Sequence, residues 1–244
     1  AWSVTALAAA RILVLLAHDL PVASRGQSLG RTGSRAPWEV LRTALPLGLV
    51  LTLVSFTSNV PRYAVGAFLG SRELGVFAAV AAFLNAGSTV ANALGQTATP
   101  RLARFYNRRD AAGFRLLSGK LAGLTLLLGV GGVLFARLAG GQFLRIAYRA
   151  DYAVHAGLLV EVMVAATFVH MAVLLGYVIT SARSFLLQLP LLLLTASAAV
   201  AANWLLVPSF GLRGAAAAIA LAAAIQITGQ LWILRRALRR AEAA

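Results

Sequence analysis

The 244-residue sequence contains no cysteine and only seven acidic residues, and both shortages exclude classes of protein. Without cysteine there is no disulfide bond, no thiolate nucleophile and no zinc–thiolate centre. Charged residues make up only 12% of the chain and hydrophobic residues 60%, whereas soluble domains average roughly 25% and 45–50%. A soluble fold of this size needs more polar surface to meet water. The composition therefore predicts an integral membrane protein.

The motifs of several enzyme classes are also missing. The sequence has no GxxxxGK[ST] phosphate-binding loop, no HExxH zinc motif and no GxSxG nucleophile elbow. Its three histidines do not predict a metal site. No pair of acidic residues lies in a loop close to the membrane, which argues against a membrane glycosyltransferase. We therefore expect neither an enzyme nor a bound cofactor.

Long hydrophobic stretches are what the sequence does contain. A helix needs about 20 mostly apolar residues to cross a bilayer. The stretch 1–17 is apolar from its first residue and lacks the basic start and cleavage site of a signal peptide. We interpret it as the end of a helix whose beginning is not included, so that the chain is a fragment or a processed piece. The sequence predicts an all-α transmembrane bundle with this partial span and six full spans, at 45–69, 74–99, 118–139, 154–180, 184–207 and 211–234.

The net charge of +15 would suggest nucleic acid as the partner of a soluble protein. Here the basic residues lie between apolar stretches, so membrane topology explains them and no nucleic-acid partner is expected. If each stretch crosses once, one side carries fifteen basic residues and the other side five. The positive-inside rule places the fifteen, and the C-terminus with them, in the cytoplasm. The fifteen are Arg25, Arg31, Arg35, Arg42, Arg101, Arg104, Arg108, Arg109, Arg115, Lys120, Arg183, Arg235, Arg236, Arg239 and Arg240.

The segments between the spans differ in character. Residues 24–36 are rich in glycine, serine and arginine and predict a flexible cytoplasmic linker. The next residues, PWEVLRTAL from Pro37, mix apolar and charged side chains and predict an elbow lying along the membrane surface before Pro46 starts the next span. Residues 101–116 are amphipathic and predict a helix in a cytoplasmic loop.

Two spans carry polar residues at helical spacing. Thr52, Ser55, Asn59 and Arg62 follow a 3-4-3 pattern, and a second stripe consists of Asn85, Ser88, Asn92, Gln96 and Thr99. Such spacing places each set on one helix face. Polar groups inside a membrane are costly and face protein or water. Two interpretations stay open, because the stripes either line a water-filled cavity or hydrogen-bond between packed helices.

Glu161 is the single acidic residue within a predicted span. A carboxylate at this depth is a candidate for coupling transport to a cation or proton. His170 lies nine residues later on an opposite helix face, so the two cannot pair within their helix. The other interpretation is that Glu161 forms an ion pair with an arginine from another span.

Four sequence runs carry a family resemblance. They are NVPRY at 59–63, LGSRELGVFAA at 69–79, ALGQTATPRLARFY at 93–106 and RADYA at 149–153. They resemble the second half of Wzx-type oligosaccharide flippases, within the multidrug/oligosaccharidyl-lipid/polysaccharide exporter superfamily. The resemblance implies that 1–17 is the last helix of a missing N-terminal lobe, 18–44 a cytoplasmic linker with the elbow, and 45–240 a C-terminal six-helix lobe.

The resemblance implies a multi-pass transporter of the cytoplasmic (inner) membrane that serves polysaccharide biosynthesis. It would move a lipid-linked oligosaccharide across the membrane by alternating access between two lobes. Its implied partners are that glycan lipid, membrane lipids, the missing lobe, and a polysaccharide polymerase or other export machinery. Arginine binds phosphate and amides bind sugar hydroxyls, so the candidate substrate-binding residues are Arg62, Asn59, Ser55, Asn85, Asn92 and Gln96.

Two alternatives to the flippase remain. One is a cation-coupled multidrug exporter of the same superfamily, which would use Glu161 in ion coupling. The other is a membrane scaffold that transports nothing, in which the polar stripes only hold helices together.

Overall fold

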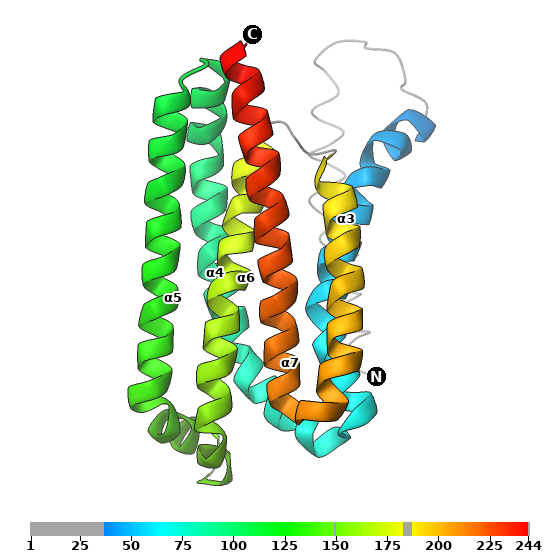
Figure 1. Ribbon diagram of the computed structural model, residues 1–244, viewed down its shortest axis with the longest axis vertical. Coiled ribbons are helices and arrows are strands. Elements are labelled where there is room, and N and C mark those ends of the chain that lie inside the picture. The colour runs from blue at the N-terminus through cyan, green and yellow to red at the C-terminus, as the bar shows by residue number, and fades with distance from the viewer. Residues whose placement is uncertain (1–36, 149, 183–186, 244) are drawn as a thin grey trace, which may run out of the picture. The chain divides into compact units, whose positions relative to one another are not determined.

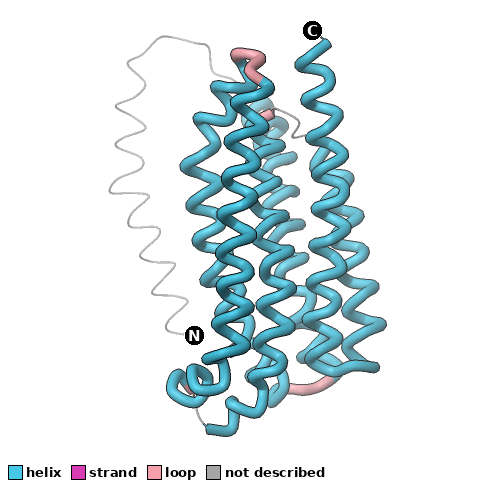
Figure 2. The backbone as a smooth tube through the Cα atoms, turned by 60° about the vertical axis from the view of Figure 1, so that its left-hand side comes forward, coloured by secondary structure: helices cyan, strands magenta, loops and turns pink. Residues whose placement is uncertain are grey.

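The computed structural model describes residues 37–148, 150–182 and 187–243, which form helices joined by short turns (Figure 2). This part of the chain contains no strand, so the predicted all-α class is confirmed for it. The predicted partial span 1–17 and linker residues 18–36 lie outside the described residues. The elements are α3 (Pro37–Phe68), α4 (Ser71–Asn107), α5 (Ala111–Ala147), the short 3-10 helix η2 (Ala150–His155), α6 (Ala156–Ser181) and α7 (Gln188–Ala243).

The helix ends differ from the predicted ones where helices extend beyond their apolar stretches. α3 begins at Pro37, so the residues predicted as an elbow and those predicted as a span belong to one helix. α4 continues past Pro100 to Asn107, and α5 begins at Ala111. The predicted loop helix at 101–116 is therefore wrong, because these residues form the ends of two long helices. Hydropathy marks where the apolar stretch ends, whereas the backbone hydrogen bonds of a helix continue into polar sequence.

The turn between α4 and α5 is closed by its own backbone and by one side chain. Arg108 and Asp110 donate their backbone N–H groups to the carbonyls of Arg104 and Phe105, at 3.1 and 3.0 Å. Arg109 adopts φ 59°, a left-handed conformation that reverses the chain. A carboxylate oxygen of Asp110 accepts the N–H of Gly113 at 2.8 Å and so caps α5.

Asp110→Ala is expected to lower the free energy of unfolding by about 1 kcal/mol, because the substitution leaves the first turn of α5 without its capping acceptor. Asp110→Asn keeps an oxygen at the same place and serves as the control. Thermal unfolding in detergent, followed by far-UV circular dichroism, measures both variants. A midpoint shift of equal size for alanine and asparagine would contradict the capping role.

α7 joins two of the predicted spans. Gly211 interrupts it with φ 60° and ψ −139°, and at this bend the chain turns back, so that two arms lie beside each other (Figure 1). A Cβ atom at Gly214 would meet the backbone of Leu206, so the arms approach closely after the bend. Positive φ favours glycine, which explains why the reversal occurs at Gly211.

The number of membrane-crossing helices differs from the predicted number. Among the described residues, four helical segments are long and apolar enough to cross a membrane: Ser71–Asn107, Ala111–Ala147, Asp151–Ser181 and Gln188–Leu238. The last of these contains both arms of α7, and α3 is not among the four. These helices are compatible with a membrane protein, but the prediction of six full spans is not confirmed.

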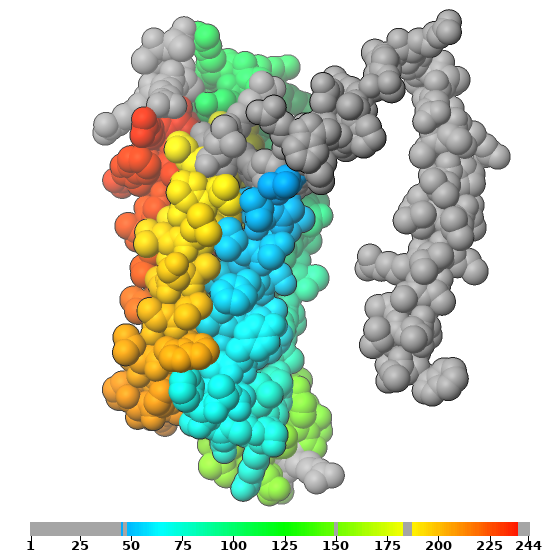
Figure 3. All heavy atoms as spheres, turned by 90° about the vertical axis from the view of Figure 1, so that its right-hand side faces the viewer, coloured from blue at the N-terminus to red at the C-terminus, as the bar shows by residue number. Residues whose placement is uncertain are grey.

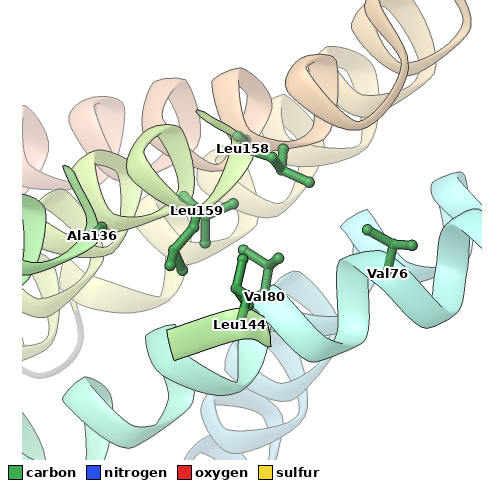
Figure 4. Packing of buried hydrophobic residues seen from close by; sticks show 8 residues of the cluster. Val76, Val80, Ala136, Leu144, Leu158 and Leu159 are labelled. Atoms are coloured by element: carbon green, nitrogen blue, oxygen red, sulfur yellow. The ribbon is translucent and has the colours of Figure 1, made fainter. Parts of the chain in front are cut away.

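α6 lies at the centre of the bundle and contacts α4, α5 and α7. In the most apolar 18-residue stretch of Asp151–Ser181, 50% of the residues are buried, whereas in the corresponding stretch of α5 only 17% are buried. One core cluster joins Val76 and Val80 of α4 to Leu144 of α5 and Leu159 of α6 (Figure 4). α5 instead exposes large apolar side chains such as Leu127, which suits a helix surrounded by lipid.

α3 packs through its second half. Ala64 and Val65 form a core cluster with Phe77 of α4 and with Val207 and Ala215 of α7. The rings of Phe68 and Trp204 meet edge to face, with centroids 5.3 Å apart. On the face shown in Figure 3, α3 lies directly beside the first arm of α7.

Basic residues gather at one end of the bundle. The α4–α5 turn and the C-terminal end of α7 lie at that end, and the α5–η2 turn and the Gly211 bend lie at the other (Figure 1). This arrangement agrees with the predicted topology, in which successive connections between helices lie alternately at the two ends of the bundle. The side of the membrane that each end faces stays a prediction.

Candidate functional site

A cavity of about 280 Å³ lies inside the bundle, between α3, α4, α6 and both arms of α7. Small and apolar residues form much of its wall, including Ala172, Ala199 and Ala222. Hydroxyl and amide side chains line the remainder, and among the described residues no acidic or basic side chain contributes to the lining. The polar residues are Thr57, Ser58, Asn85, Ser88, Asn92, Thr195, Asn203 and Gln226.

α4 places three residues of its predicted polar stripe on this cavity: Asn85, Ser88 and Asn92. Ser88 donates its hydroxyl to the carbonyl of Leu84 at 2.9 Å and keeps its lone pairs available. Asn92 accepts a hydrogen bond from the hydroxyl of Tyr177 at 3.1 Å, and its amide N–H groups stay available. This geometry agrees with the cavity interpretation of the α4 stripe. A role of Asn85 and Asn92 in binding substrate stays a prediction.

Gln96 lies one turn further along α4, exposed and outside the cavity lining. Its amide donates to the hydroxyl of Tyr177 at 3.4 Å, and this hydroxyl in turn donates to Asn92. Tyr177 belongs to α6, so the three side chains connect two helices. At this point the hydrogen-bonding interpretation of the stripe also applies.

The α3 stripe does not reach the cavity. α3 presents Thr57 and Ser58 to it, whereas the predicted Ser55, Asn59 and Arg62 lie on another part of the helix. Nη1 of Arg62 donates to Oδ1 of Asn59 at 3.0 Å, and Nδ2 of Asn59 donates to the carbonyl of Ser55 at 2.8 Å. The spacing identified a polar helix face, but the orientation of that face depends on neighbours that periodicity does not specify.

α7 contributes residues that the sequence analysis missed. Asn203 is fully buried, its Nδ2 donates to the carbonyl of Ala199 at 2.8 Å, and its Oδ1 has no partner. Thr195 lies two turns earlier on the same face and is also buried. A buried acceptor without a partner costs about 1–3 kcal/mol. Asn203 therefore places an unsatisfied polar group beside the cavity, but Oδ1 itself is closed off from solvent in this structure.

Glu161 lies away from the cavity and forms an ion pair. Its Oε1 lies 3.4 Å from Nε of Arg213 on the second arm of α7, and the side chains are 39% and 72% exposed. The structure therefore shows the second interpretation given for Glu161, an arginine partner from another helix. Its role in ion coupling stays a prediction.

His170 is buried against α4 rather than in the cavity. Its Nε2 lies 3.1 Å from the carbonyl oxygen of Leu84, and its ring packs on Gly87. In the described residues no group of three or more metal-ligating side chains occurs. His170 is therefore interpreted as a packing residue between α4 and α6.

The chain is similar to a capsular polysaccharide biosynthesis protein, CapF, of Staphylococcus aureus, with 22% identity over 198 residues. The alignment covers 81% of this chain and 50% of that protein, so the chain spans about half the length of this curated relative. No protein-family model matches, and no solved structure matches. The similarity relates the chain distantly to polysaccharide biosynthesis.

Proposed function

We propose that the chain forms one lobe of a membrane transporter that moves a lipid-linked oligosaccharide across the cytoplasmic membrane by alternating access. The observation that carries the proposal is the uncharged polar cavity inside an apolar helix bundle. The similarity to a capsular polysaccharide biosynthesis protein supports the choice of a glycan as cargo.

The chemistry of the cavity suits a sugar. Sugar hydroxyls both donate and accept hydrogen bonds, and they are expensive to bury in hydrocarbon without partners. Amides and hydroxyls, such as Asn85, Ser88 and Gln226, offer donors and acceptors without introducing a charge. The volume of about 280 Å³ is near the lower end of roughly 300–1,000 Å³ for ligand sites. The cavity therefore fits one sugar unit rather than a whole oligosaccharide.

A second lobe would complete the pathway. The relative is about twice as long as the aligned part of this chain. Arg62 and Asn59 are half-buried and hydrogen-bonded to each other, outside the cavity of this lobe. In the proposed transporter this pair lies in the space between the lobes, where the guanidinium binds the pyrophosphate of the cargo.

The alternatives predict other features. A cation-coupled drug exporter needs an acidic group where a cation binds, but the cavity lining in the described residues is uncharged, and Glu161 is paired with Arg213. A scaffold has no need of a cavity lined by amide and hydroxyl side chains inside an apolar bundle. Both features favour a transporter of a neutral polar group.

A reconstitution assay tests the proposal. The complete protein containing this chain is placed in vesicles with a lipid-linked oligosaccharide that carries a fluorophore on its glycan, and an impermeant reductant is added outside. We expect the protected inner-leaflet signal to decay faster than in protein-free vesicles. Equal decay with and without protein, or faster movement of a labelled cationic drug than of the glycan lipid, would contradict the proposal.

Asn203→Leu is expected to slow glycan-lipid transport roughly tenfold, equivalent to about 1.4 kcal/mol, because in the proposed alternating-access cycle the bundle opens and this amide then hydrogen-bonds the cargo. Leucine has a similar size and removes a buried acceptor that lacks a partner, so the thermal midpoint is expected to stay equal or rise. The transport assay and thermal unfolding measure the two effects separately. An unchanged transport rate would show that Asn203 does not contact the cargo.

A further inference from the structure

A basic cleft lies where α4 ends and α5 begins, apart from the central cavity. Its volume is about 450 Å³. Arg101, Arg104 and Arg108 line it from α4, at spacings of three and four residues that place them on one helix face, and Lys120 lines it from α5. The lining is completed by Phe105, Gly113, Leu116 and Leu117, so the cleft has cations on both walls and apolar side chains between them.

The four cations of the basic cleft have no carboxylate partner among the described residues. Elsewhere in the described residues, Glu161 pairs with Arg213, which follows the Gly211 bend at the other end of the bundle. Asp110 lies in the adjacent turn, but its carboxylate caps α5 by accepting the N–H of Gly113. Four positive charges around one hollow repel one another, and an anion bound between them would offset this repulsion.

Topology alone does not account for this arrangement. The positive-inside rule explains an excess of basic residues at one end of the spans, but it does not specify how these residues are grouped. Near the C-terminal end of α7, Arg236 lies over the ring of Trp232, 5.6 Å from its centroid. Arg101, Arg104, Arg108 and Lys120 instead converge from two helices on a shared space.

In a bilayer, the lengths of α4 and α5 would bring the basic cleft to the depth of the lipid headgroups. α4 and α5 each have 37 residues, which corresponds to about 55 Å of helix, whereas the hydrocarbon core is about 30 Å thick. Their joined ends therefore extend beyond the hydrocarbon into the headgroup region. At that depth Phe105, Leu116 and Leu117 would face the upper part of an acyl chain, and the cations would face the phosphate.

We propose that the basic cleft binds the phosphate group of a membrane lipid. Guanidinium groups bind phosphate oxygens through paired, charge-assisted hydrogen bonds, and the apolar side chains between the walls favour a phosphate that carries lipid over a free one. This proposal depends only on the geometry of α4 and α5, and it is independent of the proposed transport activity.

Calorimetric titration of the intact protein in a neutral detergent at low salt tests this site. The probes are short-chain phosphatidylglycerol, short-chain phosphatidylcholine and inorganic phosphate. We expect phosphatidylglycerol to bind at least about tenfold more tightly than the other two, because it alone combines an exposed anionic phosphate with acyl chains. Equal affinity for inorganic phosphate would overturn the lipid assignment, and equal affinity for phosphatidylcholine would overturn the anion site.

A matched pair of double variants separates the basic cleft from general surface charge. Arg101→Gln/Arg104→Gln is expected to lower phosphatidylglycerol affinity about tenfold or more, and Lys120→Gln is expected to lower it from the other wall. Arg235→Gln/Arg236→Gln removes the same charge at the same end of the bundle and is expected to change affinity less than about twofold. Equal losses in the two double variants, or no loss with Lys120→Gln, would overturn the proposal. Unchanged thermal unfolding shows that each variant is folded.

Discussion

Gly95→Val is expected to force α4 away from α6 and to lower the free energy of unfolding by about 2–3 kcal/mol, as overpacking of a tight interface does. A Cβ atom at Gly95 would lie 2.6 Å from Cγ of Tyr177, a ring atom close to the backbone that cannot move aside alone. Moving Tyr177 would also break its hydrogen bonds with Asn92 and Gln96. The effect therefore combines steric repulsion with the loss of the polar link between the two helices.

Two other glycines provide matched controls for Gly95→Val. A Cβ atom at Gly119 or Gly123 of α5 would meet nothing within 4 Å. Valine at these positions changes helix propensity without a clash, so the expected change is below about 1 kcal/mol. Thermal unfolding in detergent compares the three variants. A loss of stability at Gly119 or Gly123 as large as that at Gly95 would show that close packing on Tyr177 is not the cause.

Small residues explain why α4 and α6 approach so closely. Gly87, Ala91 and Gly95 recur every four residues on α4, and the rings of His170 and Tyr177 on α6 cover the two glycines. Helices in lipid gain little from hydrophobic burial against each other and depend on close packing and hydrogen bonds. The interface that holds Asn92 at the cavity thus combines glycines on α4 with aromatic rings on α6.

The α4 stripe was predictable from the sequence, and the α3 stripe only in part. Both patterns correctly place polar residues on one helix face, because helical periodicity fixes relative angles within a helix. For α4 that face points to the cavity with Asn85 and Asn92. For α3 the cavity receives Thr57 and Ser58 instead, because the rotation of α3 is determined by packing of Ala64 and Val65 against α4 and α7.

The cavity-lining residues of α7 were the hardest to predict from the sequence. Thr195 and Asn203 are eight residues apart in a mostly apolar stretch, which places them on one face but does not form a dense stripe. Gln226 joins them only because the bend at Gly211 brings the second arm of α7 back beside the first. The break between the predicted spans 184–207 and 211–234 did indicate a reversal here, and the structure places it at Gly211. Hydropathy does not specify which faces of the two arms meet, so the shared cavity wall was not predictable.

Ser88→Leu is expected to abolish most glycan-lipid transport, lowering the initial rate at least about tenfold, because the larger side chain would occupy the cavity and remove a hydroxyl from its wall. Ser88 lines the cavity, and its hydroxyl is bonded to its own helix at the carbonyl of Leu84, at 2.9 Å. The substitution therefore costs no hydrogen bond to a neighbouring helix. The vesicle assay with fluorescent lipid-linked oligosaccharide measures the rate.

The adjacent residue makes this experiment decisive. Thr89 is exposed, does not line the cavity and donates its hydroxyl to the carbonyl of Asn85 at 3.1 Å, the same bond to its own helix that Ser88 makes. Thr89→Leu adds a leucine at a neighbouring position of the same helix and is expected to keep the transport rate within about twofold, since this side chain does not line the cavity. Equal rates for the two variants would mean that the cargo does not enter this cavity. A loss confined to Ser88→Leu, with both proteins unfolding at the same temperature, would locate the transported sugar between α4 and α7.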